Sequence, residues 1–118
     1  MRIAVTAVGM LVLAALPGCD LISCSNEIAS SLVSPDGDHT AIVFNRNCGA
    51  TTGFNTQLSV VASHAALPDD GGNVLIADDT IELKVSWISA SELSIRGLNG
   101  AKIFKQEKQV GGVAVSYE

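Results

Sequence analysis

The stretch Thr80-Ile81-Glu82-Leu83-Lys84-Val85-Ser86-Trp87 decides the fold class, because polar and apolar residues alternate along its whole length. Successive side chains of a β-strand point to opposite faces, so this alternation is typical of a strand with one face buried and one in water. Residues 92–96 repeat the pattern, with Leu93 and Ile95 as the apolar members. The sequence therefore predicts two half-buried strands, with Trp87 in the core rather than on a stacking surface.

The residues on either side of these two segments favour further strands. Beyond residue 24 the chain consists of β-branched and alternating runs separated by turn residues, which is the signature of strands joined by short loops. Asn99-Gly100 is a strong hairpin signal, and Gly111-Gly112 predicts another turn. Further strands are expected at 26–33, 39–47, 56–62, 74–77, 101–107 and 113–117, with a loop over 63–73.

About eight short strands of this kind predict an all-β fold, either a small antiparallel β-sandwich or a partly open barrel. The alternative is a sheet covered by one helix, which would require residues 59–66 to be helical. We rank this alternative lower because Val60 and Val61 favour strand.

The first predicted hairpin carries two cysteines at matching positions. Ser34-Pro35-Asp36-Gly37 has the composition of a type I turn with glycine in the left-handed position that follows. A three-residue loop of this type places Ser34 opposite Asp38, so that the numbers of paired residues add to 72. The same sum holds for Cys24 and Cys48, and directly opposed residues lie close enough for a disulfide. The register thus predicts a disulfide between them, although a bulge could shift the pairing by one residue.

The N-terminal segment has the organisation of an export signal. Arg2 precedes an uncharged apolar run from Ile3 to Leu16, which is shorter than the roughly 20 residues that span a bilayer. Leu16-Pro17-Gly18-Cys19 then resembles the lipobox of bacterial lipoproteins. The resemblance implies that Cys19 becomes the first mature residue and carries a diacylglyceryl group and an N-acyl chain such as palmitate. An ordinary cleaved signal with a cysteine nearby is the open alternative.

Removal of this signal would leave one small, acidic domain. We predict a signal peptide over 1–18, an anchor and short tether over 19–25, and a single β-domain over 26–118. The formal net charge of −5 would become −6, because Arg2 is the only charged residue removed. The remaining basic residues are scattered, whereas nucleic-acid binding requires a concentrated positive face. The expected partners are therefore membrane lipids, reached through the acyl chains, and an envelope protein or small ligand, but no nucleic acid.

The densest polar segment runs from Arg46 to Gln57. Its side chains offer directional hydrogen bonds, and its glycines allow backbone N–H groups to approach a ligand. One interpretation is a recognition loop. The other, which we favour, is a disulfide-tethered connection whose amides and hydroxyls bond to their own backbone. The candidate ligand-binding residues are Arg46, Asn47, Thr51, Thr52, Asn55 and Gln57.

Patterns typical of catalysis or metal binding are weak. No serine lies in a G-x-S-x-G nucleophile elbow, and a disulfide explains Cys48 better than a nucleophile paired with His39 or His64 does. Asp69-Asp70 and Asp78-Asp79 lack the spacing of a calcium loop. We therefore expect no catalytic residues, no metal and no cofactor.

Three segments resemble a family of small uncharacterised bacterial exported proteins. They are Arg46-Asn47-Cys48-Gly49-Ala50-Thr51-Thr52, then Gly72-Asn73-Val74, then Val85-Ser86-Trp87. Members of that family share an R-x-C-G-A-T-T core, a G-N-V segment and a tryptophan strand. The resemblance brings no activity with it, but it draws attention to Arg46, Cys48, Thr51 and Thr52.

These features together predict a lipid-anchored, non-enzymatic binding module of the cell envelope that faces the periplasm or the cell exterior. Asp20 matches the signal that retains lipoproteins at the inner membrane of enteric-type bacteria. The alternative is an inhibitor or immunity protein against a secreted enzyme, since an acidic surface would steer it to a basic target. A third hypothesis is a hydrolase that uses a serine or Cys48.

Overall fold

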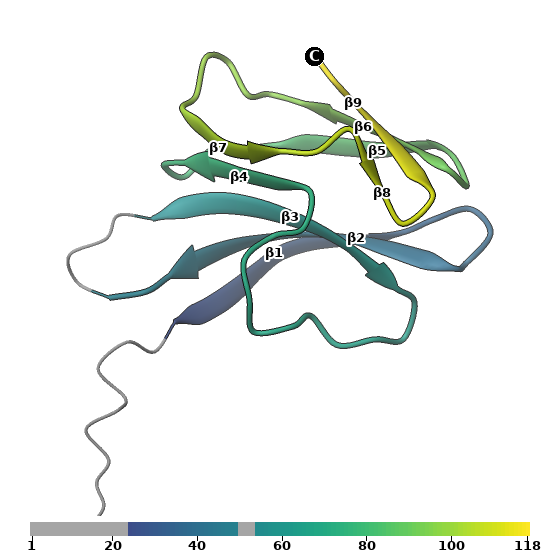
Figure 1. Ribbon diagram of the computed structural model, residues 1–118, viewed down its shortest axis with the longest axis horizontal. Helices are drawn as coiled ribbons and strands as arrows, with labels where there is room; N and C mark the ends of the chain where they lie inside the picture. The colour runs from purple at the N-terminus through teal and green to yellow at the C-terminus, as the bar shows by residue number, and fades with distance from the viewer. Residues whose placement is uncertain (1–23, 50–53) are drawn as a thin grey trace, which may run out of the picture.

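The computed structural model describes residues 24–49 and 54–118, which form strands and turns without a helix. Nine strands make two sheets that face each other, and this confirms the predicted all-β sandwich (Figure 1). The five-stranded sheet has the order β1 (Ser25–Val33), β2 (His39–Asn47), β3 (Asn55–Ala62), β4 (Leu75–Asp78) and β7 (Ile103–Gln106). The four-stranded sheet has the order β5 (Lys84–Ser89), β6 (Glu92–Arg96), β9 (Val113–Tyr117) and β8 (Gln109–Val110).

Buried apolar side chains from both sheets form one core cluster between them. Trp87 of β5 packs against this cluster, as the sequence predicted. Its Nε1 donates a hydrogen bond to the carbonyl oxygen of Leu32 in β1 at 3.0 Å, which joins the neighbouring edges of the two sheets. We call the side of the five-stranded sheet that faces the core its inner face. The buried residues of the cluster are Ala41, Val43, Leu58, Val60, Val74, Leu75, Leu93, Ile95, Val113 and Val115.

The opposite, outer face of the five-stranded sheet is covered by residues 63–73, the connection between β3 and β4. Phe44 alternates with the core residue Val43 and so points to this outer face, yet it is fully buried. Two side chains of β3 accept hydrogen bonds from the backbone of this connection. Gln57 Oε1 accepts the Gly72 N–H at 2.6 Å, and Ser59 Oγ accepts the next N–H along the chain at 3.1 Å. The predicted loop therefore acts as a strap across the sheet.

Gly72-Asn73 forms the joint between this strap and β4. A Cβ at Gly72 would lie 2.7 Å from the Leu58 carbonyl oxygen, so only glycine fits against the strand. The Asn73 side chain accepts the Val60 N–H and donates to the Val60 carbonyl oxygen, both at 2.9 Å. The Asn73 side chain thereby supplies Val60 with the hydrogen bonds that a neighbouring strand would make, just before β4 begins.

The β1–β2 hairpin contains the predicted turn but departs from the predicted register at two places. Gly37 has a φ of +79° and donates to the Ser34 carbonyl oxygen, as a type I turn followed by a left-handed glycine requires. Ser34 pairs with His39 rather than with Asp38, because the Ser34 N–H bonds to the His39 carbonyl oxygen at 2.8 Å and the Ser34 hydroxyl accepts the His39 N–H at 3.1 Å.

A bulge restores the predicted register farther from the turn. Between the turn and Ser30 the paired residues follow the shifted register, as in Ser30 opposite Val43. The bulge lies between Ile28 and Ser30, and beyond it Ile28 faces Phe44, as the simple register requires. The two departures cancel, so the strand ends that carry the cysteines meet as predicted.

Two predicted segments near the crossovers between the sheets need correction. β5 begins at Lys84 rather than at Thr80, because the Ile81 N–H bonds to the Thr56 hydroxyl of β3 at 2.9 Å and holds this part of the chain between the sheets. Asn99-Gly100 is a turn but closes no hairpin, since β6 and β7, which it joins, belong to different sheets. A local turn signal carries no information on which sheet the next strand enters.

The pairing of the four-stranded sheet also differs from an entirely antiparallel arrangement. β6 and β9 are parallel, with Leu93 opposite Val115 and Ile95 opposite Tyr117. The short strand β8, which the sequence did not predict, pairs with β9 across the predicted Gly111-Gly112 turn. β1 begins at Ser25, one residue inside the segment predicted to be tether.

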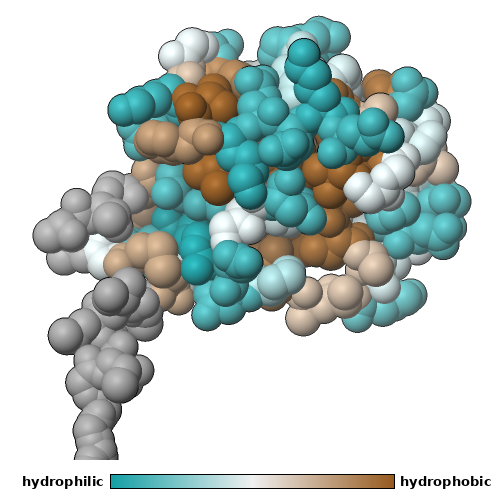
Figure 2. All heavy atoms as spheres, viewed as in Figure 1, coloured by the Kyte–Doolittle hydropathy of each residue, from teal (hydrophilic) through white to brown (hydrophobic). Residues whose placement is uncertain are grey.

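Several large apolar side chains of the described residues remain in contact with water. Figure 2 shows apolar atoms distributed among hydrophilic residues on one face of the molecule. Two of the exposed apolar side chains come from β1, the edge strand of the larger sheet. The five are Ile28, Val33, Phe54, Ile88 and Phe104.

Candidate functional site

The predicted ligand-binding residue Arg46 forms bonds within the fold. Its side chain is only 13% exposed and, two residues after Phe44 in β2, lies on the outer face of the hairpin. Nη1 donates to Asn26 Oδ1 at 2.8 Å and to Asp69 Oδ1 at 3.2 Å. Asn26 in turn donates to the Pro68 carbonyl oxygen at 3.2 Å. The guanidinium therefore links both strands of the hairpin to the strap.

The other described members of the predicted recognition segment also bond within the chain. Gln57 is 3% exposed, and besides its bond to the strap its Nε2 donates to Asn55 Oδ1 at 2.9 Å. Asn47 Oδ1 accepts the Gly49 N–H at 3.1 Å. Only the Asn47–Gly49 bond is of the kind expected for a connection that bonds to its own backbone, since Arg46 and Gln57 reach the strap instead. Thr51 and Thr52, like the predicted lipidation site Cys19, lie outside the described residues, and ligand contact by this segment stays a prediction.

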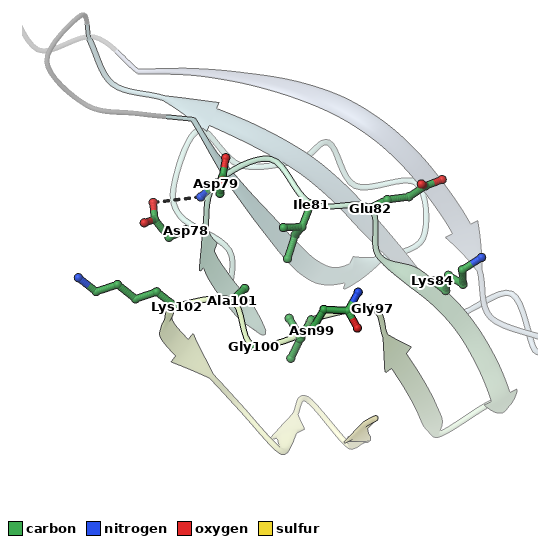
Figure 3. Close-up of a pocket in the computed structure, with 11 residues that line it drawn as sticks. Asp78, Asp79, Ile81, Glu82, Lys84, Gly97, Asn99, Gly100, Ala101 and Lys102 are labelled. Carbon is green, nitrogen blue, oxygen red and sulfur yellow. Dashed lines mark hydrogen bonds between the residues drawn. The ribbon is translucent and has the colours of Figure 1, made fainter.

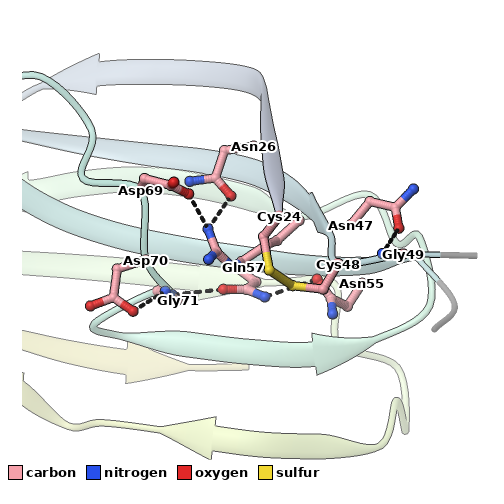
Figure 4. Close-up of a disulfide and its surroundings, with 12 residues drawn as sticks. Cys24, Asn26, Asn47, Cys48, Gly49, Asn55, Gln57, Asp69, Asp70 and Gly71 are labelled. Carbon is pink, nitrogen blue, oxygen red and sulfur yellow. Dashed lines mark hydrogen bonds and ion pairs between the residues drawn. A yellow bond between two sulfur atoms is a disulfide. The ribbon is translucent and has the colours of Figure 1, made fainter. Parts of the chain in front are cut away.

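The predicted disulfide closes the hairpin at the end opposite its turn. Cys24 and Cys48 are joined, and their Cα atoms lie 3.9 Å apart (Figure 4). Cys48 therefore has no thiol available for the nucleophilic role considered from the sequence. His39 lies at the first position of β2, and His64 lies at the start of the strap with a φ of +72°.

Two titratable groups have shifted pKa values with local causes. The hydroxyl of Ser34 donates to Asp36 at 2.6 Å, and this bond, with the Asp38 N–H, lowers the pKa of Asp36 below its ordinary 3.8. Burial raises the pKa of Tyr117 to about 12, and the nearby charge of Glu107 acts in the same direction. Asp36 lies in the hairpin turn and Tyr117 at the end of β9. Neither group lines a cavity described below.

One cavity of about 540 Å³ lies where the two crossovers between the sheets run side by side (Figure 3). Gly97 brings them together, since a Cβ there would lie 2.7 Å from the Glu82 carbonyl oxygen. Asp78 and Asp79 each accept a backbone N–H from the following residue, at 3.0 and 2.8 Å. Lys84 and Lys102 add positive charge to the same lining. The carboxylates thus support their own turns, and the mixed charge defines no single class of ligand.

Two adjoining cavities lie on the inner face of the β1–β2 hairpin, near the disulfide. They have volumes of about 440 and 230 Å³, and Asn45 lines both. Trp87 covers the same face of the hairpin nearer its turn, whereas polar residues occupy the inner-face positions near the disulfide. We call these two cavities together the open groove. Its lining consists of Ser25, Glu27, Ala29, Ser30, Val43, Asn45, Asn47, Phe54 and residues 80–83.

Sequence reasoning missed the open groove, although a signal for it is present. Ser25, Glu27, Asn45 and Asn47 occupy inner-face positions that are apolar closer to the turn. A polar residue at such a position indicates that nothing apolar packs against it. Recognising this signal requires the true register, which the bulge shifts by one residue.

Residues 24–49 and 54–118 contain neither a cluster of metal-binding side chains nor a membrane-spanning helix. Within these ranges no group of three or more histidine, cysteine, aspartate or glutamate side chains is placed to hold a metal ion. The same ranges contain no helix long and apolar enough to span a membrane.

Comparison with protein-family models, with curated proteins and with solved structures finds no significant match to this chain.

Proposed function

We propose that this protein is an exported lipoprotein of the bacterial cell envelope whose mature domain binds another molecule without catalysing a reaction. The Cys24–Cys48 disulfide is the observation that carries the proposal, because disulfides persist in oxidising compartments outside the cytosol. The export signal over 1–18 and the lipobox-like Leu16-Pro17-Gly18-Cys19 support the same location. Asp20 favours the inner membrane if the source is an enteric-type bacterium.

Anchoring at Cys19 would hold the domain close to the bilayer. Five residue steps separate Cys19 from Cys24, and an extended chain covers at most about 3.6 Å per step, or about 18 Å in all. Two or more acyl chains make such an anchor stable, whereas one chain binds only marginally. The disulfide end of the hairpin, with the open groove beside it, would then face the membrane-proximal space.

The described candidate side chains bond within the fold, so binding would use other surfaces, and a cysteine hydrolase lacks its nucleophile. Arg46, Asn47, Asn55 and Gln57 bond to the strap, to each other or to neighbouring backbone. Cys48 is in the disulfide, which removes the nucleophile of a cysteine hydrolase. The R-x-C-G-A-T-T string supports membership in the family of small exported proteins that it resembles, and Thr51 and Thr52 remain its candidate contact residues.

Metabolic labelling with a palmitate analogue tests the anchor. We expect the wild-type chain to take up label and to sediment with membranes, and Cys19→Ala to lose both properties. The matched control is the double variant Cys24→Ala/Cys48→Ala, which has no disulfide but should keep its label. Intact-mass measurement of wild-type protein that still begins at Met1, or label that persists in Cys19→Ala, would contradict the proposal.

An inhibitor or immunity protein against a secreted enzyme is the second candidate. The observation that favours it is the acidic character of the chain, with a net charge of −5 and two carboxylates beside the open groove. Such a surface accelerates encounter with a cationic partner. Assays against lysozyme-like cationic enzymes test it, and absence of inhibition at micromolar protein would remove this candidate.

A further inference from the structure

We infer that the open groove and the adjoining edge of β1 receive an extended basic segment of a partner protein, which adds to the five-stranded sheet as a further strand. The inference deepens the proposed binding function and rests on it, since it names the surface and the class of partner. It requires an edge that can accept a strand, a face that can accept side chains, and a charge that selects basic residues.

The edge is provided by β1, which is the terminal strand of the five-stranded sheet. β1 contains no lysine or proline, two residues that commonly protect sheet edges, and its only charged residue is Glu27. The bulge at Ala29 divides the strand into two runs. Both runs contribute to the lining of the open groove, but only Ser25–Ile28 carries a charge, that of Glu27, so we assign the added strand to this run.

The face is provided by the open groove beneath that run. An added strand places alternate side chains over the inner face, where the two cavities of about 440 and 230 Å³ lie side by side at Asn45. Phe54 stands at one end of the groove and is 59% exposed. On the outer face the neighbouring apolar side chain is Ile28, which is 55% exposed.

The charge around the groove selects a basic segment. Glu27 and Glu82 line it, and among the described residues no lysine, arginine or histidine does. Arg46 belongs to the same hairpin but lies on the outer face, where it pairs with Asp69 at 3.2 Å. Lys84 and Lys102 line the crossover cavity, which shares Ile81 and Glu82 with the groove, but neither lysine lines the groove itself. A segment with cations on its inner-facing side chains and apolar groups on its outer-facing ones therefore fits both faces of the run.

Capped synthetic peptides test this inference. The protein is purified in the form that cells produce. An eight-residue peptide that alternates lysine and valine should bind in fluorescence anisotropy, and added salt should weaken it. A peptide of equal composition with all lysines before all valines cannot present one kind of residue to each face and should bind at least tenfold more weakly. Two further alternating peptides carry N-methyl groups, one at every lysine and the other at every valine. In an added strand only alternate backbone N–H groups face β1, so one of these two peptides should lose binding and the other should keep it.

Variants locate the binding surface. Glu27→Gln should weaken binding of the alternating peptide about fivefold, which is the effect of losing one partly exposed charge pair. The matched control is Glu107→Gln, which removes the same charge just beyond β7 at the opposite edge of the sheet and should change nothing. Glu27→Lys/Glu82→Lys should instead bind a peptide that alternates glutamate and valine. Circular dichroism and an intact disulfide would show that each variant is folded.

Several outcomes would overturn the inference. Equal binding of the alternating and block peptides would indicate charge attraction without strand addition, and equal losses in Glu27→Gln and Glu107→Gln would place the site elsewhere. Sedimentation of the wild type as a dimer that Glu27→Lys disrupts would assign the edge to a second copy of the chain. None of these results affects the palmitate-labelling experiment, so failure of this inference and failure of the proposed lipoprotein function are distinguishable.

Discussion

The two ends of the β1–β2 hairpin are held by different forces. At the turn end the strands lie under the four-stranded sheet, with Leu32 bonded to Trp87 and the turn secured by Ser34 and Asp36. At the disulfide end the inner face is open and polar, and a covalent bond joins Cys24 to Cys48. The difference shows that a strand can be kept in place without burial when a crosslink limits the unfolded chain, which leaves its surface available for binding.

The largest expected effect comes from removing the crosslink. Cys24→Ala/Cys48→Ala should lower the free energy of unfolding by about 3.5 kcal/mol, according to the chain-entropy model for a loop of this length. Urea denaturation measures this loss, and hydrogen exchange should accelerate most at Ser25–Ile28. A uniform acceleration along the whole hairpin would show that its two ends are not separately stabilised.

The bond between the sheets at the turn end is the next contribution. Trp87→Phe keeps an aromatic ring in the core but removes the indole N–H that donates to the Leu32 carbonyl oxygen, which should cost about 1 kcal/mol in urea denaturation followed by circular dichroism. The control is Tyr117→Phe, which removes an exposed bond to the Glu107 carbonyl oxygen and should cost less. A larger loss in the control would refute the role assigned to Trp87.

The conformation of the turn contributes less. Gly37→Ala should destabilise the protein by about 1 kcal/mol, because an L-residue is strained at positive φ. No atom lies within 4 Å of the added Cβ, so a steric clash does not contribute. Gly37→Asn is the matched variant and should lose less in thermal denaturation, since asparagine tolerates this conformation better. Equal losses would mean that backbone strain is not the cause.

The smallest expected effect is the pH dependence of the turn. Hydrogen bonding from Ser34 lowers the pKa of Asp36 below 3.8, so this group stabilises the folded state above that pH. The contribution is lost as the pH falls through the lowered pKa. Asp36→Asn should therefore flatten the acid limb of a plot of urea midpoint against pH between about 5 and 3. An unchanged acid limb would show that the bond has no net effect on stability.

The alternating and β-branched runs beyond residue 24 were sufficient for the fold class, because strand periodicity is a local property. The disulfide was also predicted correctly, although the argument for it was incomplete. Ser34 pairs with His39, not Asp38, and only the bulge at Ala29 compensates for that shift. The roles of Arg46 and Gln57 could not be read from their neighbours in sequence, because Asp69 and Gly72 reach them from the strap.

The sequence by itself determined that this chain forms strands, where its first hairpin turns, and which cysteines pair. These properties depend on side-chain alternation, backbone preference and short-range register. The tertiary structure alone decided that Asn99-Gly100 leads to the other sheet, that β6 and β9 are parallel, and that the hairpin stays open beside its disulfide. These features depend on how much of one sheet the other sheet covers. Packing between residues that are distant in sequence sets this coverage.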